Sequence, residues 1–247
     1  KIWFDITNTP HVHFLLGVKE TLDQINEYTY TYTSRDFSET NKLLKQKIGD
    51  DFTTIGKHYG KRKLDKVRGL LSRFAQISRS VGDYDISISN GSESAIWLSY
   101  LKGKKSIAFG DNDTARQWTY GRFVSFAFFP DAIEQSILTR QGITERRLYR
   151  YHGYKEDIYL AGFNPDPAFL QNLPFDEYVI VRPENLMANY IRNDNVKSIT
   201  PALLKMLSEA GINILYLPRY ASDHEYARGV KGMHIPEEPL NGLDACY

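Results

Sequence analysis

Two histidines stand where a helix is expected to begin. His11 and His13 follow Asn8 and Thr9 in a polar turn, after an apolar stretch and before a run with helical periodicity. The free N–H groups at such a helix start suit a phosphate or a carboxylate, and each imidazole could donate to it or act as an acid or base. The alternative is a capped helix with two surface histidines. Because a His-x-His pair alone lacks a third ligand, no metal site is expected here.

Two further turns carry polar groups that a purely structural turn does not require. The first could bind an anion, or its serine could only cap the next helix. The second clusters carboxylates that could do acid–base work or bind sugar hydroxyls, or its last aspartate could only cap a helix. The first turn consists of Asn90, Gly91 and Ser92, and the second of Asp111, Asn112 and Asp113.

Charged residues follow apolar segments again in the last third of the chain. Arg182 could bind a phosphate through two parallel hydrogen bonds, and Glu184, next to Asn185, could bind the hydroxyls of a ribose or another sugar. Arg219 repeats this pattern after the next apolar segment. A structural Arg–Glu pair is the alternative.

Alternating strand and helix patterns must position these turns. Their order is typical of an α/β protein with βαβ units and a doubly wound parallel sheet, in which ligands bind beyond the carboxyl ends of the strands. Asp36 or Ser38 is expected to cap the second helix. The expected strands are residues 2–7, 28–33, 52–55, 85–89, 105–109 and 123–129, and the expected helices follow at 14–26, 38–49, 64–81 and 94–101.

The chain is expected to divide into three parts. Residues 1–150 form an N-terminal Rossmann-like domain, residues 151–174 a connector rich in glycine and proline, and residues 175–247 a second Rossmann-like domain. Two strands and one helix cannot bury both faces of a sheet, so this second domain is expected to be incomplete and the chain to be part of a longer protein. Its expected elements are strands at 178–182 and 213–217, a helix at 198–210 and the opening of another at 242–247, after a short helix near 166–172.

Composition and missing motifs exclude several classes of protein. Hydrophobic residues make up 42% of the 247 residues and charged residues 25%, which are globular values. The single cysteine, Cys246, excludes an internal disulfide framework. No apolar run is long enough to span a bilayer, and we expect a cytoplasmic protein. The absence of GxGxxG, P-loop, HExxH and nucleophile-elbow motifs argues against Walker-type ATPases, common zincins and the usual dehydrogenases.

Positive charge is concentrated in residues 42–79. This segment holds eleven Lys and Arg against three Asp, whereas the whole chain has a net charge of only +1. Such a segment could dock peripherally on an anionic membrane surface, or its cations could simply form the solvated face of helices. No clear stacking platform accompanies it, so nucleic acid is not an expected partner.

Four motifs together resemble a known family. KIWFDITNTPHVHF, GDNDTA, HGYKEDIYLAGFNPDP and VRPEN resemble the mostly archaeal domain-of-unknown-function family 354 over essentially the whole chain. This family is similar in turn to UDP-N-acetylglucosamine 2-epimerases and other nucleotide-sugar enzymes of the GT-B fold. The resemblance implies two Rossmann-like domains that face each other across a cleft, with most of the nucleotide site in the C-terminal one. It also implies catalysis without a metal or another cofactor.

The sequence departs from the epimerase pattern at two motifs. Arg182, Glu184 and Asn185 match the Arg-x-Glu-Asn core, but Val181 stands where epimerases have a histidine. The His-Gly-Asp turn of epimerases corresponds to residues 90–92, so that its acidic residue is lost or displaced to Glu93. These departures favour sugar-nucleotide binding over the epimerase reaction itself.

The leading hypothesis is therefore a GT-B-type enzyme that transfers a sugar from a nucleotide in the synthesis of a surface polysaccharide or glycoconjugate. His11, His13, Asp111 and Asp113 are the candidate catalytic residues. A UDP-N-acetylhexosamine 2-epimerase and a non-catalytic binding protein on the same scaffold are the alternatives. The sequence leaves the oligomeric state open.

Overall fold

The computed structural model divides the chain into two compact units. The first unit is Lys1–Gly162 and the second is Phe163–Tyr247. The structure describes residues 1–37, 39–57, 63–186, 196–238 and 240–246. None of the helices in these ranges is both long and apolar enough to cross a membrane.

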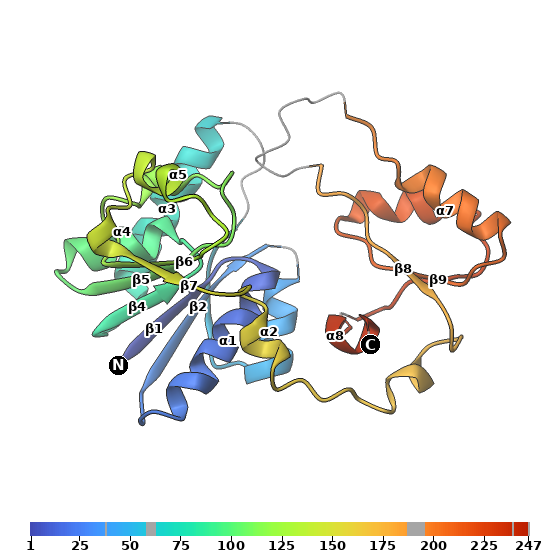
Figure 1. Ribbon diagram of the computed structural model, residues 1–247, viewed down its shortest axis with the longest axis horizontal. Helices are drawn as coiled ribbons and strands as arrows, with labels where there is room; N and C mark the ends of the chain where they lie inside the picture. Colours follow the sequence, from blue (N-terminus) through green and yellow to red (C-terminus); the bar gives the residue numbers. More distant parts are fainter. Residues whose placement is uncertain (38, 58–62, 187–195, 239, 247) are drawn as a thin grey trace. The chain divides into compact units, whose positions relative to one another are not determined.

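A parallel sheet of seven strands forms the centre of the first unit, as far as the structure describes it (Figure 1). The strand order is β3-β2-β1-β4-β5-β6-β7, so the chain moves outward from β1 in one direction and then from β4 in the other. The switch point of this doubly wound sheet therefore lies between β1 and β4. The strands are β1 (Ile2–Ile6), β2 (Tyr30–Asp36), β3 (Thr53–Lys57), β4 (Ile86–Ser89), β5 (Lys105–Phe109), β6 (Phe126–Pro130) and β7 (Leu148–Tyr151).

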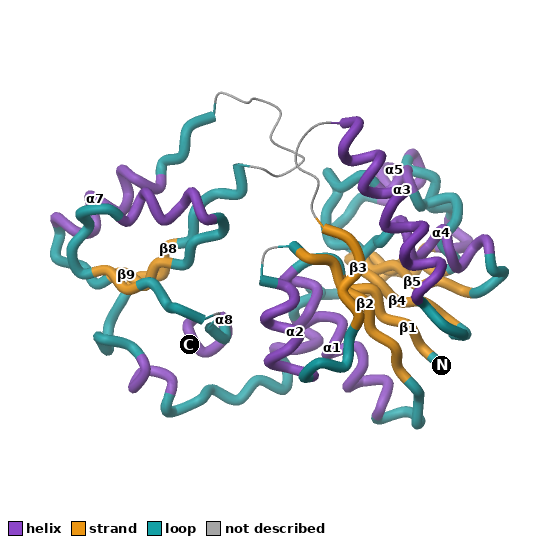
Figure 2. Tube along the Cα trace, turned by 180° about the vertical axis from the view of Figure 1, so that it is seen from behind, coloured by secondary structure: helices purple, strands orange, loops and turns teal. Residues whose placement is uncertain are grey.

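Helices cover both faces of this sheet (Figure 2). Successive side chains of β1 alternate between the faces: Phe4 packs with α1 and α2, whereas Trp3 packs with α3 and α4. Every residue of β1 is buried, as expected for the central strand of a parallel sheet. The helices are α1 (Thr9–Asp23), α2 (Thr40–Ile48), α3 (Lys63–Ser80), α4 (Glu93–Leu101), α5 (Gln135–Arg140) and α6 (Asp157–Leu160), with 3₁₀ helices η1 (Gln117–Thr119) and η2 (Glu145–Arg147).

The predicted alternation of strands and helices is confirmed, with three differences in the first unit. The helix α1 begins at Thr9 and not at residue 14, because Pro10 occupies its first turn, where the fixed φ of proline is favourable. Sequence analysis did not predict β7, α5 or α6. The first residue of α2 is Thr40; Ser38, one of its two predicted caps, lies outside the described residues.

The second unit has a smaller parallel sheet, with the order β10-β9-β8. Leu204 of α7 packs against Tyr216 on one face, and Ala245 of α8 packs with Leu215 on the other. Strand β10, two residues long, was not predicted, whereas the predicted helix opening after residue 242 is confirmed as α8. The elements are η3 (Phe169–Asn172), β8 (Val179–Val181), α7 (Thr200–Glu209), β9 (Ile214–Tyr216), η4 (Ala221–Ala227), β10 (Met233–His234) and α8 (Gly242–Cys246).

Candidate functional site

Two helices begin at the switch point of the first unit, at the carboxyl ends of β1 and β4. Asn8 caps α1 by accepting a hydrogen bond of 2.9 Å from the N–H of Thr9. Ser92 caps α4 by accepting a bond of 3.4 Å from the N–H of Ala95, so its predicted capping role is confirmed. Because β1 pairs with β4, both helix starts lie at the same edge of the sheet.

The two predicted histidines lie inside α1 and not in a turn, and the structure does not bring them together. Two residues along an α-helix correspond to a rotation of about 200°, so the rings point to different sides. His11 Nδ1 lies 3.4 Å from Thr7 Oγ1 at the sheet edge. The ring of His13 packs 5.8 Å from that of Tyr159 in α6, and burial lowers the pKa of His13.

His11 lies among charged groups from four other parts of the first unit. Burial is the main cause that lowers its pKa to about 3; the nearby cations Lys155 and Arg35 contribute to the lowering, and Asp111 and Asp5 oppose it. The imidazole is therefore neutral throughout the physiological pH range. Lys155 Nζ forms an ion pair with Asp111 and lies 3.8 Å from Glu156.

Several polar atoms at this edge are buried and have no hydrogen-bond partner within the described part of the chain. They are Nε of Arg35 near the end of β2, Oδ1 of Asn90 after β4 and the hydroxyl of Tyr151 at the end of β7. Burial and the charge of Asp111 raise the pKa of Tyr151 to about 12. A buried polar atom without a partner costs about 1–3 kcal/mol, which a bound polar ligand would recover.

We refer to His11, Arg35, Asp111, Tyr151 and Lys155 as the His11 cluster. Sequence analysis selected His11 and Asp111 because they follow strands. It missed Arg35 and Tyr151, which are the ends of other strands, and Lys155, which lies in the segment assigned to the connector. Arg35 and Tyr151 could have been predicted from their positions at strand ends. Lys155 could not, because 44 residues separate it from its partner Asp111.

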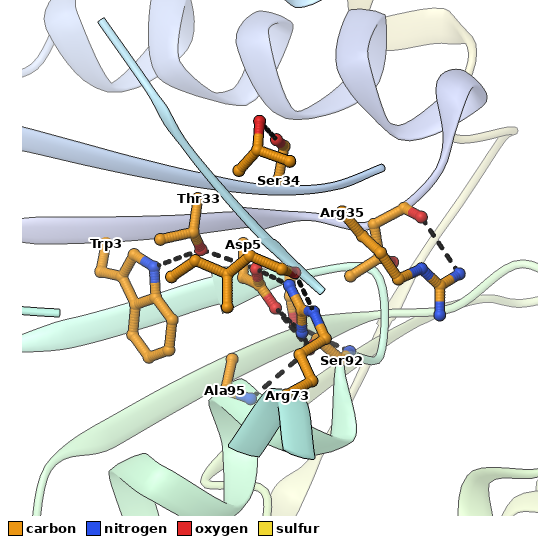
Figure 3. A network of polar contacts seen from close by, with 12 residues as sticks. Trp3, Asp5, Thr33, Ser34, Arg35, Arg73, Ser92 and Ala95 are labelled. Carbon is orange, nitrogen blue, oxygen red and sulfur yellow. Dashed lines mark hydrogen bonds and ion pairs between the residues drawn. The ribbon is translucent and has the colours of Figure 1, made fainter. Parts of the chain in front are cut away.

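A buried polar network around Asp5 lies close to Arg35 of this cluster (Figure 3). Asp5 is fully buried in β1 and accepts two hydrogen bonds from the Arg73 guanidinium of α3, at 2.6 and 3.0 Å. The hydroxyls of Thr33 and Ser92 also donate to Asp5, and Trp3 Nε1 donates to Thr33. Burial by itself raises the pKa of Asp5, but Arg73 and these hydroxyls hold it below its usual value.

The network changes the interpretation of Ser92. Sequence analysis proposed a contact between Ser92 and substrate, but its side chain is buried and its hydroxyl is already bonded to Asp5 and to the start of α4. The neighbouring Gly91 has a φ of +70°, and a Cβ added there would lie 2.8 Å from the hydroxyl of Tyr120. Tyr120 therefore covers the turn of residues 90–92 closely.

The remaining predicted residues of the first unit lie in the loop after β5 and at the start of α1. Asn112 closes its own turn by accepting from the N–H and the hydroxyl of Thr114 at 2.7 and 2.6 Å. Asp113 is exposed in the same loop. The hydroxyl of Thr9 lies 3.3 Å from that of Thr40 in α2.

The four predicted residues of the second unit lie at the carboxyl ends of β8 and β9. Glu184 receives hydrogen bonds from Ser198, Ile199 and Thr200 at the start of α7, and despite its partial burial these bonds lower its pKa to about 2. The Glu184 carboxylate therefore stabilises the start of α7 by accepting these hydrogen bonds. The further contacts are Asn185 Oδ1 with the Tyr220 hydroxyl at 2.9 Å and Arg219 Nε with the Pro183 carbonyl at 2.6 Å, while Arg182 is exposed.

The basic segment carries less free charge than its composition predicts. Arg73 is buried against Asp5, and Lys45 lies 2.9 Å from Asp50. The basic loop 58–62 lies outside the described residues. Among the residues that are described, no three His, Cys, Asp or Glu side chains are grouped as metal ligands.

A seven-stranded doubly wound sheet followed by a second parallel-sheet unit defines an α/β protein with the GT-B-like fold, as expected. The chain belongs to the family described as a protein of unknown function, DUF354, whose match covers residues 1–247. No curated protein sequence matches it.

Solved structures with this fold are similar to the chain at low sequence identity. A UDP-N-acetylglucosamine 2-epimerase of Rickettsia bellii matches with a TM-score of 0.62 and 9% identity, over 96% of this chain and 68% of its own. MnaA of S. aureus, solved with UDP, matches with a TM-score of 0.64 and 12% identity, over 99% of this chain and 70% of its own. A UDP-GlcNAc 2-epimerase of Neisseria meningitidis bound to UDP-GlcNAc matches with a TM-score of 0.56 and 10% identity, over 100% of this chain and 74% of its own. These identities establish the shared fold alone.

Proposed function

We propose that this protein is an enzyme that transfers a sugar from a nucleotide-activated donor. The observation that carries the proposal is the His11 cluster, which gathers a neutral imidazole, two cations and a carboxylate at the switch point of the sheet. Ligands of doubly wound sheets bind at that position. Similarity to structures solved with UDP and UDP-GlcNAc supports a nucleotide sugar as the ligand.

His11 is the proposed base of the reaction. Its neutral ring can take the proton from an acceptor hydroxyl while the acceptor oxygen bonds to the anomeric carbon of the sugar. The bond between that carbon and the phosphate oxygen breaks, and the nucleoside diphosphate leaves with the electron pair. The negative charges of a bound diphosphate would raise the pKa of His11 and make it a stronger base.

Asp111 and Lys155 are proposed to position the sugar or acceptor through hydrogen bonds to its hydroxyls. Asn90, with its buried and unpartnered amide oxygen, is proposed as a further contact. Among the predicted residues of the second unit, Arg182 and Arg219 are proposed to contact the nucleotide phosphates. His13 packs against Tyr159 and Asp113 is not a member of the His11 cluster, so both are secondary candidates for acid–base work.

A panel of UDP-, GDP-, TDP- and CMP-sugars tests the proposal through the melting temperature of the protein. A ligand that binds the folded state raises this temperature, and the nucleotide that responds selects the activity assay. His11→Ala and Asp111→Ala are expected to abolish turnover with the fold intact. His152→Ala is the matched control, because the His152 side chain is fully exposed in the same unit.

The products distinguish the alternatives. Free nucleoside diphosphate with a glycosylated acceptor supports transfer, whereas a C2-inverted sugar with no acceptor consumed identifies a 2-epimerase. If no nucleotide sugar raises the melting temperature at millimolar concentration, the proposal fails. Salt-sensitive binding to anionic vesicles through residues 42–79 would then favour the non-catalytic binding protein.

A further inference from the structure

One face of strands β5, β6 and β7 carries aromatic side chains that the unit leaves partly open. On the opposite face, Ala127 and Phe129 are completely buried with Leu138 of α5. On the open face, Phe126 and Phe128 of β6 are only half-buried, and Tyr149 of β7 is 44% exposed. Parallel sheets normally bury both faces, so this difference between two faces of the same strands needs an explanation.

The rings form a continuous row across the strands. Phe109, Phe128 and Tyr149 are register partners, with ring centroids 5.2 Å apart for the first pair and 5.1 Å for the second. Phe126 also packs against Tyr149, at 5.8 Å. Phe14 of α1 covers only the Phe109 end of the row, at 4.9 Å. We refer to Phe109, Phe126, Phe128 and Tyr149 as the aromatic row.

This aromatic row leads directly into the His11 cluster. Tyr151 lies two residues beyond Tyr149 within β7, so these two side chains lie on the same face of the strand, about 6.7 Å from each other. Asp111 follows the end of β5, two residues after Phe109. Lys155 pairs with Asp111 at the end of the row. The aromatic row and the His11 cluster therefore adjoin through Tyr149 and Tyr151 of β7.

We infer that the acceptor of the proposed transfer is a phosphate-headed lipid whose head lies in the His11 cluster and whose hydrocarbon chain lies along the aromatic row. This inference rests on the proposed function and names the class of its second substrate. Arg35 is a cation and the Tyr151 hydroxyl is a buried donor without a partner among the described residues, so both suit a phosphate head. Lys155 is already paired with Asp111, and the half-open rings supply apolar area next to the head. A free phosphate would leave the aromatic row unused.

A series of alkyl phosphates from methyl to octyl tests the inference, with the complete chain and without a nucleotide sugar. Each methylene that is buried should lower the dissociation constant roughly threefold to fourfold. The matched variants are Tyr149→Glu in the aromatic row and Tyr100→Glu on α4, where the ring is 56% exposed and packs against Phe123. Both positions are exposed, and the melting temperature checks that both variants fold.

We expect Tyr149→Glu to lose at least half of the dependence on chain length and Tyr100→Glu to retain it. Equal affinities for methyl and octyl phosphate would overturn the inference, as would equal chain-length dependence in both variants. A melting shift with nucleotide sugars but no chain-length effect would contradict the lipid acceptor alone. A chain-length effect without any nucleotide-sugar binding would instead contradict the proposed transfer.

Discussion

At the scale of single residues, two neighbouring polar groups of the first unit differ in whether their hydrogen-bonding atoms have partners. Asp5 of the buried network has hydrogen-bond donors from Thr33, Arg73 and Ser92. In the His11 cluster, by contrast, Arg35 Nε and the Tyr151 hydroxyl are without partners among the described residues. The first arrangement is typical of structure and the second of a ligand site.

The lowered pKa of His11 predicts a loss of stability in mild acid. Burial is the main cause of the lowering, and Lys155 adds to it. The unfolded chain binds a proton near pH 6.5 and the folded chain only near pH 3, so the stabilising contribution is complete above pH 6.5 and is lost as the pH falls. Between pH 7 and 5, this histidine should cost about 2 kcal/mol of unfolding free energy. Urea unfolding of His11→Asn should show a correspondingly smaller loss, and an identical pH profile would contradict the assignment.

Arg73 provides a second test at this scale. Arg73→Met leaves the Asp5 carboxylate buried without its cation, which typically costs about 3–5 kcal/mol. The double variant Asp5→Leu/Arg73→Met removes both charges and should recover most of that loss. Denaturant unfolding of the two variants measures the difference. Equal stability of the single and double variants would show that the pair is not the cause.

At the scale of elements, the sequence predicted the sheet well and the helix starts less well. β-favouring segments between helical patterns were enough to predict β1 to β6. The central strand β1 is a mostly apolar run buried along its whole length, whereas β2 alternates Tyr and Thr. Pro10 was interpreted as a turn residue, although it lies in the first turn of α1. The ion pair of Asp5 with Arg73 was missed because 68 residues separate the two, and only a folded structure shows which of many cations faces one aspartate.

The turn between β4 and α4 predicts different costs for two glycine substitutions. Gly91 and Gly103 both have left-handed backbones, with φ of +70° and +65°. A Cβ at Gly91 would lie 2.8 Å from Tyr120, whereas a Cβ at Gly103 would have nothing within 4 Å. Gly103→Ala should therefore cost about 1–2 kcal/mol through the backbone alone.

Gly91→Ala carries the same backbone cost and an additional steric cost. It should be less stable than Gly103→Ala by about 1 kcal/mol or more in denaturant unfolding. Equal losses for the two alanine variants would show that Tyr120 moves aside freely.

At the scale of the whole molecule, the chain consists of two units that each have their own hydrophobic core. The first unit packs its core on both faces of a seven-stranded sheet, and the second on both faces of a smaller sheet. The restart of the strand–helix alternation predicted the second unit, but the two residues of β10 were too short a signal. The GT-B-like fold was predicted only through the resemblance to a family.

Because each unit has its own core, a core substitution in one unit should lower the melting temperature of that unit and leave the other unchanged. Leu138 of α5 and Leu204 of α7 are both completely buried, one in each unit. In differential scanning calorimetry we expect two transitions, with Leu138→Ala lowering one and Leu204→Ala the other. Each substitution should cost about 2–5 kcal/mol in its own unit. A single transition lowered equally by both variants would show that the units unfold together.

The central position of β1 has a consequence for how the protein is made. Its two neighbours differ greatly in sequence distance: Ile2 pairs with Tyr30 on one side and with Ile86 on the other. During synthesis β1 therefore leaves the ribosome long before β4 exists to pair with it. The unpaired edge of this apolar strand must wait for more than eighty residues of translation before β4 is made. The Asp5 carboxylate must wait for 68 residues before its Arg73 guanidinium is made. The growing chain is thus most exposed to misfolding, and most dependent on chaperones, before the sheet can close around its first strand.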